Sequence, residues 1–199
     1  MPRVAVFYDW QNCYHLAREV FCSDRDPTRY GNFWPKAMAE LLASKGPAGP
    51  QPPTVSYVGV YVGVPEPRID PRGAAAQSRR IAAWKNEAGP PLVVRSRGLR
   101  YPSGGAPEEK GIDVQLAIDA MVMAVRGEYE VAIIASADTD LLPVVEGLLA
   151  LKALNGTPSV EVIGWKGLSQ GLVVPGATMR WIGDRDFLAV RDHTDYNFP

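Results

Sequence analysis

This sequence is poor in the residues from which several common functional sites are built. It contains two cysteines, Cys13 and Cys22, and two histidines, His15 and His193. The cysteine spacing matches no metal motif and predicts no disulfide framework, so we expect two reduced thiols in a cytoplasmic protein. Two histidines are too few for a histidine-rich metal site, and His15 is expected to be a partly buried residue of a helix.

Other features are missing altogether. No uncharged apolar run reaches membrane-spanning length, and the first residues show no charged-then-apolar leader. No Walker A motif and no Ser-His-Asp arrangement can be recognised. The sequence therefore predicts a protein without a membrane partner, and it gives no support to P-loop or serine-hydrolase chemistry.

Neither sign of charge dominates the chain. There are 21 Lys and Arg residues against 22 Asp and Glu residues, so the net charge is −1. The distribution is uneven, however, because residues 68–100 hold eight basic and two acidic side chains, a local charge of +6, and the remainder carries −7. This segment is a candidate phosphate-facing surface, with Arg95, Arg97 and Arg100 at its end.

The pattern of apolar runs predicts the fold class. Short runs rich in strand-forming residues occupy 3–8, 54–64, 91–97, 131–135, 159–164 and 179–182, and helical patterns occupy 10–21, 33–44, 73–88, 111–125 and 141–154. This alternation indicates an α/β protein of three layers, α/β/α, around a mostly parallel sheet. We expect one domain over 1–183 and a loose polar tail over 184–199. The helix at 111–125 is apolar nearly all round, which predicts that it is buried.

Four aspartates fall where such a sheet places its functional site. Asp9 follows the first strand, Asp138 and Asp140 follow the fourth, and Asp113 lies in the first turn of the apolar helix. Ligands of doubly wound sheets bind beyond the carboxyl ends of the strands, so all four should meet at one edge. Crowded carboxylates repel one another unless a cation lies between them. Mg²⁺ suits such a site, and it can activate water and neutralise a phosphoryl transition state.

Each aspartate also has a purely structural interpretation. An Asp after a strand is often a turn residue or a helix cap, as Asp140 would be before Leu141. An Asp in the first turn, such as Asp113, interacts favourably with the helix dipole. The metal site is favoured because three separate segments place acids at the same edge.

Three motifs, in this order, resemble the NYN domain family, a branch of the PIN-like nuclease fold. They are a strand followed by Asp9-Trp10-Gln11-Asn12, the run Lys110-Gly111-Ile112-Asp113-Val114 with Asp119 in the same helix, and a strand ending in Ser136-Ala137-Asp138-Thr139-Asp140. The resemblance spans roughly residues 3–182. It implies a PIN-like (Rossmannoid) sheet and a metal-dependent ribonuclease that uses Mg²⁺ or Mn²⁺. Its metal-binding and catalytic residues would be Asp9, Asp113, Asp138 and Asp140.

The resemblance also implies roles for neighbouring residues. Asn12 would orient a ligand or a water, and Ser136 would shape the turn after the fourth strand. Lys110 is either a phosphate contact or a solvated lysine before a helix. Asp119 lies six positions after Asp113, about 120° around an ideal helix. It is therefore expected to lie behind the metal-binding residues and not to face the metal itself.

The leading hypothesis is therefore an endoribonuclease that cleaves single-stranded or structured RNA, with Arg95 and Arg97 among the substrate contacts. Two alternatives remain open from the sequence. One is a non-catalytic NYN-like module that binds RNA or a protein, and the other is a metal-dependent phosphohydrolase that acts on nucleotides. A homo-oligomer is possible in each case.

Overall fold

A computed structural model describes residues 1–46, 51–103, 105–168 and 171–198 of the chain. Its centre is a six-stranded sheet in which neighbouring strands are parallel. The strands are β1 (Arg3–Asp9), β2 (Thr54–Val64), β3 (Leu92–Gly98), β4 (Val131–Ala135), β5 (Ser159–Trp165) and β6 (Thr178–Ile182). They lie side by side in the order β3-β2-β1-β4-β5-β6.

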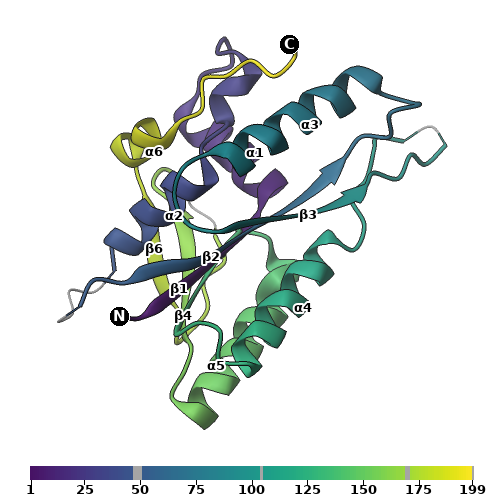
Figure 1. Cartoon of the computed structure of the whole chain (residues 1–199). Helices are drawn as coiled ribbons and strands as arrows, with labels where there is room; N and C mark the ends of the chain where they lie inside the picture. Colours follow the sequence, from purple (N-terminus) through teal and green to yellow (C-terminus); the bar gives the residue numbers. More distant parts are fainter. Residues whose placement is uncertain (47–50, 104, 169–170, 199) are drawn as a thin grey trace.

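Helices cover both faces of this sheet (Figure 1). The helices are α1 (Trp10–Phe21), α2 (Pro35–Ser44), α3 (Pro71–Asn86), α4 (Ile112–Val125), α5 (Leu142–Asn155) and α6 (Asp184–Val190), with short 3-10 turns η1 (Thr28–Gly31) and η2 (Thr139–Leu141). One apolar cluster joins the sheet to α1, α2, α3 and α6, and a second joins it to α4 and α5. The predicted three-layer α/β/α architecture is therefore confirmed.

The central strand β1 shows how the sequence produces two cores. Its side chains alternate between the faces, so that Val4, Val6 and Tyr8 enter the first cluster while Ala5 and Phe7 enter the second. All five are at most 2% exposed. A strand that is buried on both faces reads as a continuous apolar run, which is the pattern of β1 in the sequence.

The direction of winding reverses between β1 and β4. From β1 the chain moves outward to β2 and β3, and then returns through α4 to place β4 on the other side of β1. Connections diverge at this point, which opens a crevice beyond the carboxyl ends of the two strands. Asp9 is the last residue of β1, and Ser136 to Asp138 directly follow β4.

The prediction that α4 is buried all round is wrong for one of its sides. Ile112, Leu116 and Ala120 are buried against the sheet, but the opposite side is exposed and equally apolar. An apolar pattern indicates that burial of a helix side is favourable, but it does not show whether the chain itself covers that side. In the part of the chain that the structure describes, no helix is long and apolar enough to cross a membrane.

The prediction of a loose C-terminal tail is also wrong. Residues 184–190 form α6, and the chain then pairs with the segment before α2 through a bridge between Phe33 and Arg191. Phe187 is fully buried, and its ring lies 4.9 Å from that of Phe21. Asp192 is also buried and accepts a hydrogen bond from the Tyr196 hydroxyl group at 2.6 Å. The segment is polar in composition, yet a few buried side chains fix it. The division of the chain at residue 183 stays a prediction.

We expect Phe187→Ala to destabilise the protein by about 3–5 kcal/mol, because it removes a fully buried aromatic ring. Leu188→Ala is the matched control, since this neighbour is 57% exposed and should change the free energy of unfolding by no more than about 0.5 kcal/mol. Urea unfolding of the two variants measures the difference. Equal, small effects would mean that α6 is detached from the core in solution.

Candidate acidic site at the carboxyl ends of β1 and β4

A cleft of about 330 Å³ opens at the crevice between β1 and β4. It is lined by Asp9, Gln11, Asn12, His15, Leu16, Glu109, Asp113 and Asp138. We call it the acidic cleft, because four of these side chains are carboxylic acids that come from three different segments. The structure thus brings together three of the four predicted aspartates. His15, predicted to be partly buried, is exposed at its wall.

Asp9 is the most enclosed acid of the cleft. Its side chain is 5% exposed, accepts a hydrogen bond from the backbone N–H of Asn12 at 3.3 Å as the N-cap of α1, and accepts a second from the Ser136 hydroxyl group at 2.8 Å. Burial raises the pKa of Asp9 to about 7, and the charges of Asp113 and Glu109 add to the rise, although the two hydrogen bonds oppose it. The fold therefore holds this carboxyl group in place but leaves its negative charge uncompensated.

Asn12 and Ser136 tie the two sides of the cleft together. The Ser136 hydroxyl group donates to Asp9 and accepts a hydrogen bond from the backbone N–H of Asp138 at 3.0 Å. The amide oxygen of Asn12 accepts from the backbone N–H of Ala137 at 2.9 Å, so α1 is bonded to the turn after β4. These contacts fix the spacing between Asp9 and Asp138. Asn12 thus orients the protein's own backbone, in addition to lining the cleft.

Asp113 enters the cleft because of the turn that precedes it. Gly111 adopts a positive φ of 74°, a conformation that L side chains rarely adopt, and α4 begins directly afterwards. This turn puts Asp113 in the first turn of the helix, half-buried, between the acidic cleft and the neighbouring groove between α4 and α5. Burial raises its pKa, and the charges of Asp138 and Asp140 raise it further.

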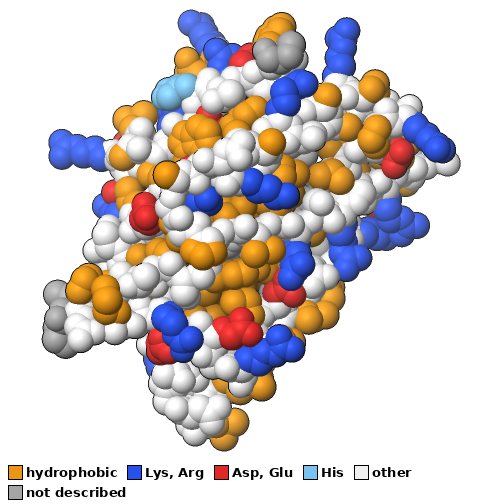
Figure 2. All heavy atoms as spheres, in the orientation of Figure 1, with side chains coloured by type: hydrophobic (Ala, Val, Ile, Leu, Met, Phe, Trp, Pro, Cys, Tyr) orange, Lys and Arg blue, Asp and Glu red, His pale blue; other side chains and the backbone are white. Residues whose placement is uncertain are grey.

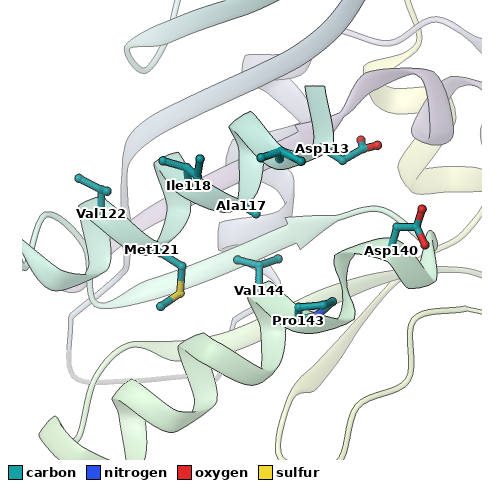
Figure 3. Close-up of a pocket in the computed structure, with 9 residues that line it drawn as sticks. Asp113, Ala117, Ile118, Met121, Val122, Asp140, Pro143 and Val144 are labelled. Atoms are coloured by element: carbon teal, nitrogen blue, oxygen red, sulfur yellow. The ribbon is translucent and has the colours of Figure 1, made fainter. Parts of the chain in front are cut away.

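Asp138 and Asp140 diverge after β4. Asp138 caps η2, its carboxylate accepting from the backbone N–H of Asp140 at 2.9 Å, and it lines the cleft. Asp140 is exposed and lines the groove between α4 and α5 instead. Figure 3 shows its carboxylate at the same end of that groove as Asp113. Asp140 therefore adds negative charge beside the cleft but does not line it.

Glu109 is a site residue that the sequence analysis missed. It lines the cleft, and its carboxylate accepts a hydrogen bond from the backbone N–H of Gly63 at 2.5 Å. A Cβ at Gly63 would overlap this carboxylate, so the glycine makes the approach possible. Burial raises the pKa of Glu109, and the charge of Asp113 contributes. Its position two residues before Gly111, close to the motif that contains Asp113, is the sequence signal that could have identified it.

Asp119, predicted to support the site, and the predicted substrate contacts Arg95, Arg97 and Lys110 do not line the cleft. Asp119 accepts hydrogen bonds from the Tyr61 hydroxyl group at 3.0 Å and from the Arg95 guanidinium at 3.1 Å. Arg97 donates to the Gln115 side chain at 3.1 Å and lies beside Gly111, close to the start of α4. Lys110 is exposed and lines a separate hollow with Arg100 and Tyr101. Lys110 directly precedes Gly111, and the Arg97 guanidinium lies beside Gly111, so both residues flank the turn that precedes α4.

The basic segment over 68–100 does not form one continuous surface. Arg79 donates to the backbone carbonyl of Tyr196, and Arg80 donates to the side-chain oxygen of Asn32 at 3.0 Å, so both point inward. The other basic side chains of the segment are exposed but divided between two places, with Arg68, Arg72 and Lys85 at or near α3 and Arg95, Arg97 and Arg100 on β3 and just after it. Figure 2 shows basic side chains spread over the visible face. A sum of charges along the sequence does not distinguish guanidinium groups that hold the fold from those that face solvent.

The donors in the cleft fit a hard divalent cation that is bound partly through water. All four acids supply oxygen ligands. Burial, and to a smaller extent repulsion from neighbouring acids, raises the pKa values of Asp9, Asp113 and Glu109, and a bound cation would favour their charged forms. Within the described residues, no three His, Cys, Asp or Glu side chains are gathered tightly enough to hold a metal ion by themselves. This arrangement suits Mg²⁺ in particular, because that ion keeps several waters and binds one or two carboxylates.

Comparison with known proteins agrees with the three motifs and the fold. The family model described as NYN domain matches residues 3–170, which includes every acid of the cleft. No curated protein and no solved structure matches the chain. The NYN family model covers most of the chain. The parallel α/β sheet is consistent with the PIN-like architecture of that family. The chain therefore belongs to the NYN domain family of the PIN-like nuclease superfamily.

Proposed function

We propose that this protein is a metal-dependent ribonuclease that hydrolyses RNA phosphodiester bonds at the acidic cleft. One observation carries the proposal: Asp9, Asp113 and Asp138 come from three segments and line one cleft at the point where the strand order reverses. Membership of the NYN domain family supports a nuclease role in general. The metal, the RNA substrate and a cytoplasmic location are parts of this proposal.

The acids of the cleft would hold Mg²⁺ or Mn²⁺, with Asp9, Asp113 and Asp138 as ligands directly or through water, and Asp140 and Glu109 adding negative charge nearby. When bound, such an ion supplies the positive charge that activates water and stabilises a phosphoryl transition state. The protein's contribution is preorganisation. Ser136 and the N-terminus of α1 fix both oxygens of Asp9.

The substrate would reach the cleft along the edge formed by Arg97 and Lys110. Carboxylates alone repel a phosphate, so the RNA backbone needs cationic side chains beside the cleft. Arg97 lies next to the start of α4, whereas the guanidinium of Arg95 is already paired with Asp119. We take single-stranded or locally unpaired RNA as the substrate, because a small cleft accepts one strand more readily than a duplex.

Asp138→Asn should lower metal-dependent cleavage of labelled RNA by about 100-fold or more, because it removes charge where the metal is held while keeping the side chain's shape. Raising the concentration of Mg²⁺ or Mn²⁺ should restore part of the activity. Asp24→Asn, at an exposed aspartate of the loop after α1, is the matched control and should cleave like the wild type. A nucleotide panel runs in parallel.

If the wild type cleaves no RNA with any metal, the non-catalytic binding module becomes the better account. If the wild type hydrolyses nucleotides and not RNA, a metal-dependent phosphohydrolase becomes the better account. Equal cleavage by wild type and Asp138→Asn would place the activity elsewhere.

Asp9→Asn should change the stability of the metal-free protein in a pH-dependent way. The pKa of Asp9 is raised from its ordinary value of 3.8 to about 7 in the folded protein. The folded state therefore binds this proton more tightly than the unfolded chain, and the wild type loses stability as the pH rises through that interval. The stabilisation by Asn should be on the order of 2–3 kcal/mol larger at about pH 8 than at about pH 5.

Urea unfolding of both proteins in EDTA at the two pH values measures this difference. An advantage of Asn that is the same at both pH values would show that the buried carboxylate carries no uncompensated charge.

Arg97→Ala should weaken RNA binding and reduce the salt dependence of the affinity by about 0.7 in the logarithmic slope, the value for one lost phosphate contact on a single strand. Arg95→Ala should have a smaller effect, because Asp119 already neutralises that guanidinium. Arg185→Ala, at an exposed residue of α6, is the distant control. Filter binding with the inactive Asp138→Asn background avoids cleavage. Equal slopes for all three variants would remove Arg97 from the RNA path.

A further inference from the structure

A second pocket, of about 250 Å³, lies on a different side of α1 from the acidic cleft. Tyr14 is the residue of α1 that lines it, whereas Asn12 and Leu16, each about 160° around the helix from Tyr14, line the cleft. Its other walls include η1 with Asn32 after it, α3, and residues 195–197 near the C-terminus. We call it the polar pocket, and among the described residues it shares no lining side chain with the acidic cleft.

Arg80 determines which groups the wall of the polar pocket offers to a ligand. Its guanidinium donates to the side-chain oxygen of Asn32 at 3.0 Å and to the side-chain oxygen of Gln77. A guanidinium group has only donors, so both amides must turn their oxygens to it, which leaves their nitrogens as donors. Asn32 and Gln77 are each 4% exposed, so bulk water competes little for these groups. The three side chains together form a wall of hydrogen-bond donors.

Two donors of this wall have no partner. The amide nitrogen of Gln77 and the Nε of Arg80 are buried, and neither makes a hydrogen bond within the part of the chain that the structure describes. Leaving a buried donor without an acceptor is unfavourable, and native proteins rarely do so without a functional reason or a bound group. The polar pocket therefore suits a ligand whose atoms accept hydrogen bonds and donate none.

The charges of the polar pocket favour an anion. Arg80 is partly buried, and no carboxylate of a described residue lies within ion-pair distance of it. Burial lowers the pKa of Arg80, although charged neighbours, Asp192 among them, oppose this effect. Arg29 is a second cation of the lining and is paired with Asp195 at 3.1 Å. Two arginines and one aspartate give the lining side chains a net charge of +1.

A phosphate group meets both requirements. Its terminal oxygens only accept hydrogen bonds, and it offers more of them than the two oxygens of a carboxylate, which matches the several free N–H groups of the wall. We propose that the polar pocket binds a phosphate group, free or carried by a nucleotide, through Asn32, Gln77 and Arg80. This site is separate from the acidic cleft, and the inference does not depend on the proposed nuclease activity.

Calorimetric titration of the full chain in EDTA at constant ionic strength tests the site, because without a divalent cation the acidic cleft repels phosphate. Inorganic phosphate should bind with a dissociation constant of about 1 mM or below, and acetate should bind at least about 10-fold more weakly. A nucleoside 5′-monophosphate, and an RNA oligonucleotide with and without a 5′-phosphate, distinguish the possible sources of the group. The source that fits the pocket should bind more tightly than inorganic phosphate.

Gln77→Glu is the decisive variant, because it changes the charge of the wall and hardly its shape. The new carboxylate pairs with Arg80, so the fold should keep its free energy of unfolding, but it repels an anion and should raise the dissociation constant by about 30-fold or more. Gln51→Glu is the matched control. Gln51 is exposed and contacts the amino group of Met1, at the opposite edge of the sheet, so this variant should bind phosphate like the wild type.

Nuclear magnetic resonance locates the binding. The side-chain N–H resonances of Gln77 and Arg80 should shift on addition of phosphate, and those of Gln51 should not. Three results would overturn the proposal. The first is no saturable binding of any of the phosphate-bearing ligands up to about 20 mM. The second is binding that Gln77→Glu leaves unchanged, which would place it elsewhere. The third is acetate that binds as tightly as phosphate, which would remove the preference for a phosphate group.

Discussion

The architecture of the site depends on holding like charges together at the end of the central strand. Asp9 is almost fully enclosed, and its raised pKa records that burial and nearby acids oppose its ionisation. Hydrogen bonds from Ser136 and from the start of α1 keep it in place nonetheless. The same serine binds the backbone of Asp138, so a single hydroxyl group couples the ends of β1 and β4. The fold stabilises a geometry that its own electrostatics disfavours, which is the usual condition of a binding site.

Helix α4 connects the acidic cleft to the core of the protein. Its N-terminal turn brings Asp113 to the acidic cleft, its inner side packs on the sheet, and its outer side is exposed. Asp113 lies at the boundary between the cleft and the groove between α4 and α5, so it lines both.

Much of the fold and of the acidic cleft could be predicted from the sequence, because parallel strands and the residues at their ends can be recognised from local sequence patterns. The alternation of strands and helices predicted the α/β/α layers. Asp9 and Asp138 could be assigned to the carboxyl-end edge of the sheet, because each stands at or just after the end of a strand. Glu109 was missed because its role depends on the distant backbone N–H of Gly63. Arg80 was counted as surface charge because its inward contact with Asn32 is formed only in the tertiary structure. Helix α4 was taken as buried because an apolar pattern does not show whether the chain itself covers each side of a helix.

The central claim is that the acids around Asp9 bind a divalent cation. Anomalous scattering from crystals soaked in Mn²⁺ tests it most directly, since the signal locates the ion independently of any activity. The account predicts a manganese peak within the acidic cleft, between Asp9, Asp113 and Asp138, that is absent from crystals of Asp138→Asn soaked alongside. A cleft without a peak at saturating Mn²⁺, or a peak that Asp138→Asn leaves unchanged, would contradict it.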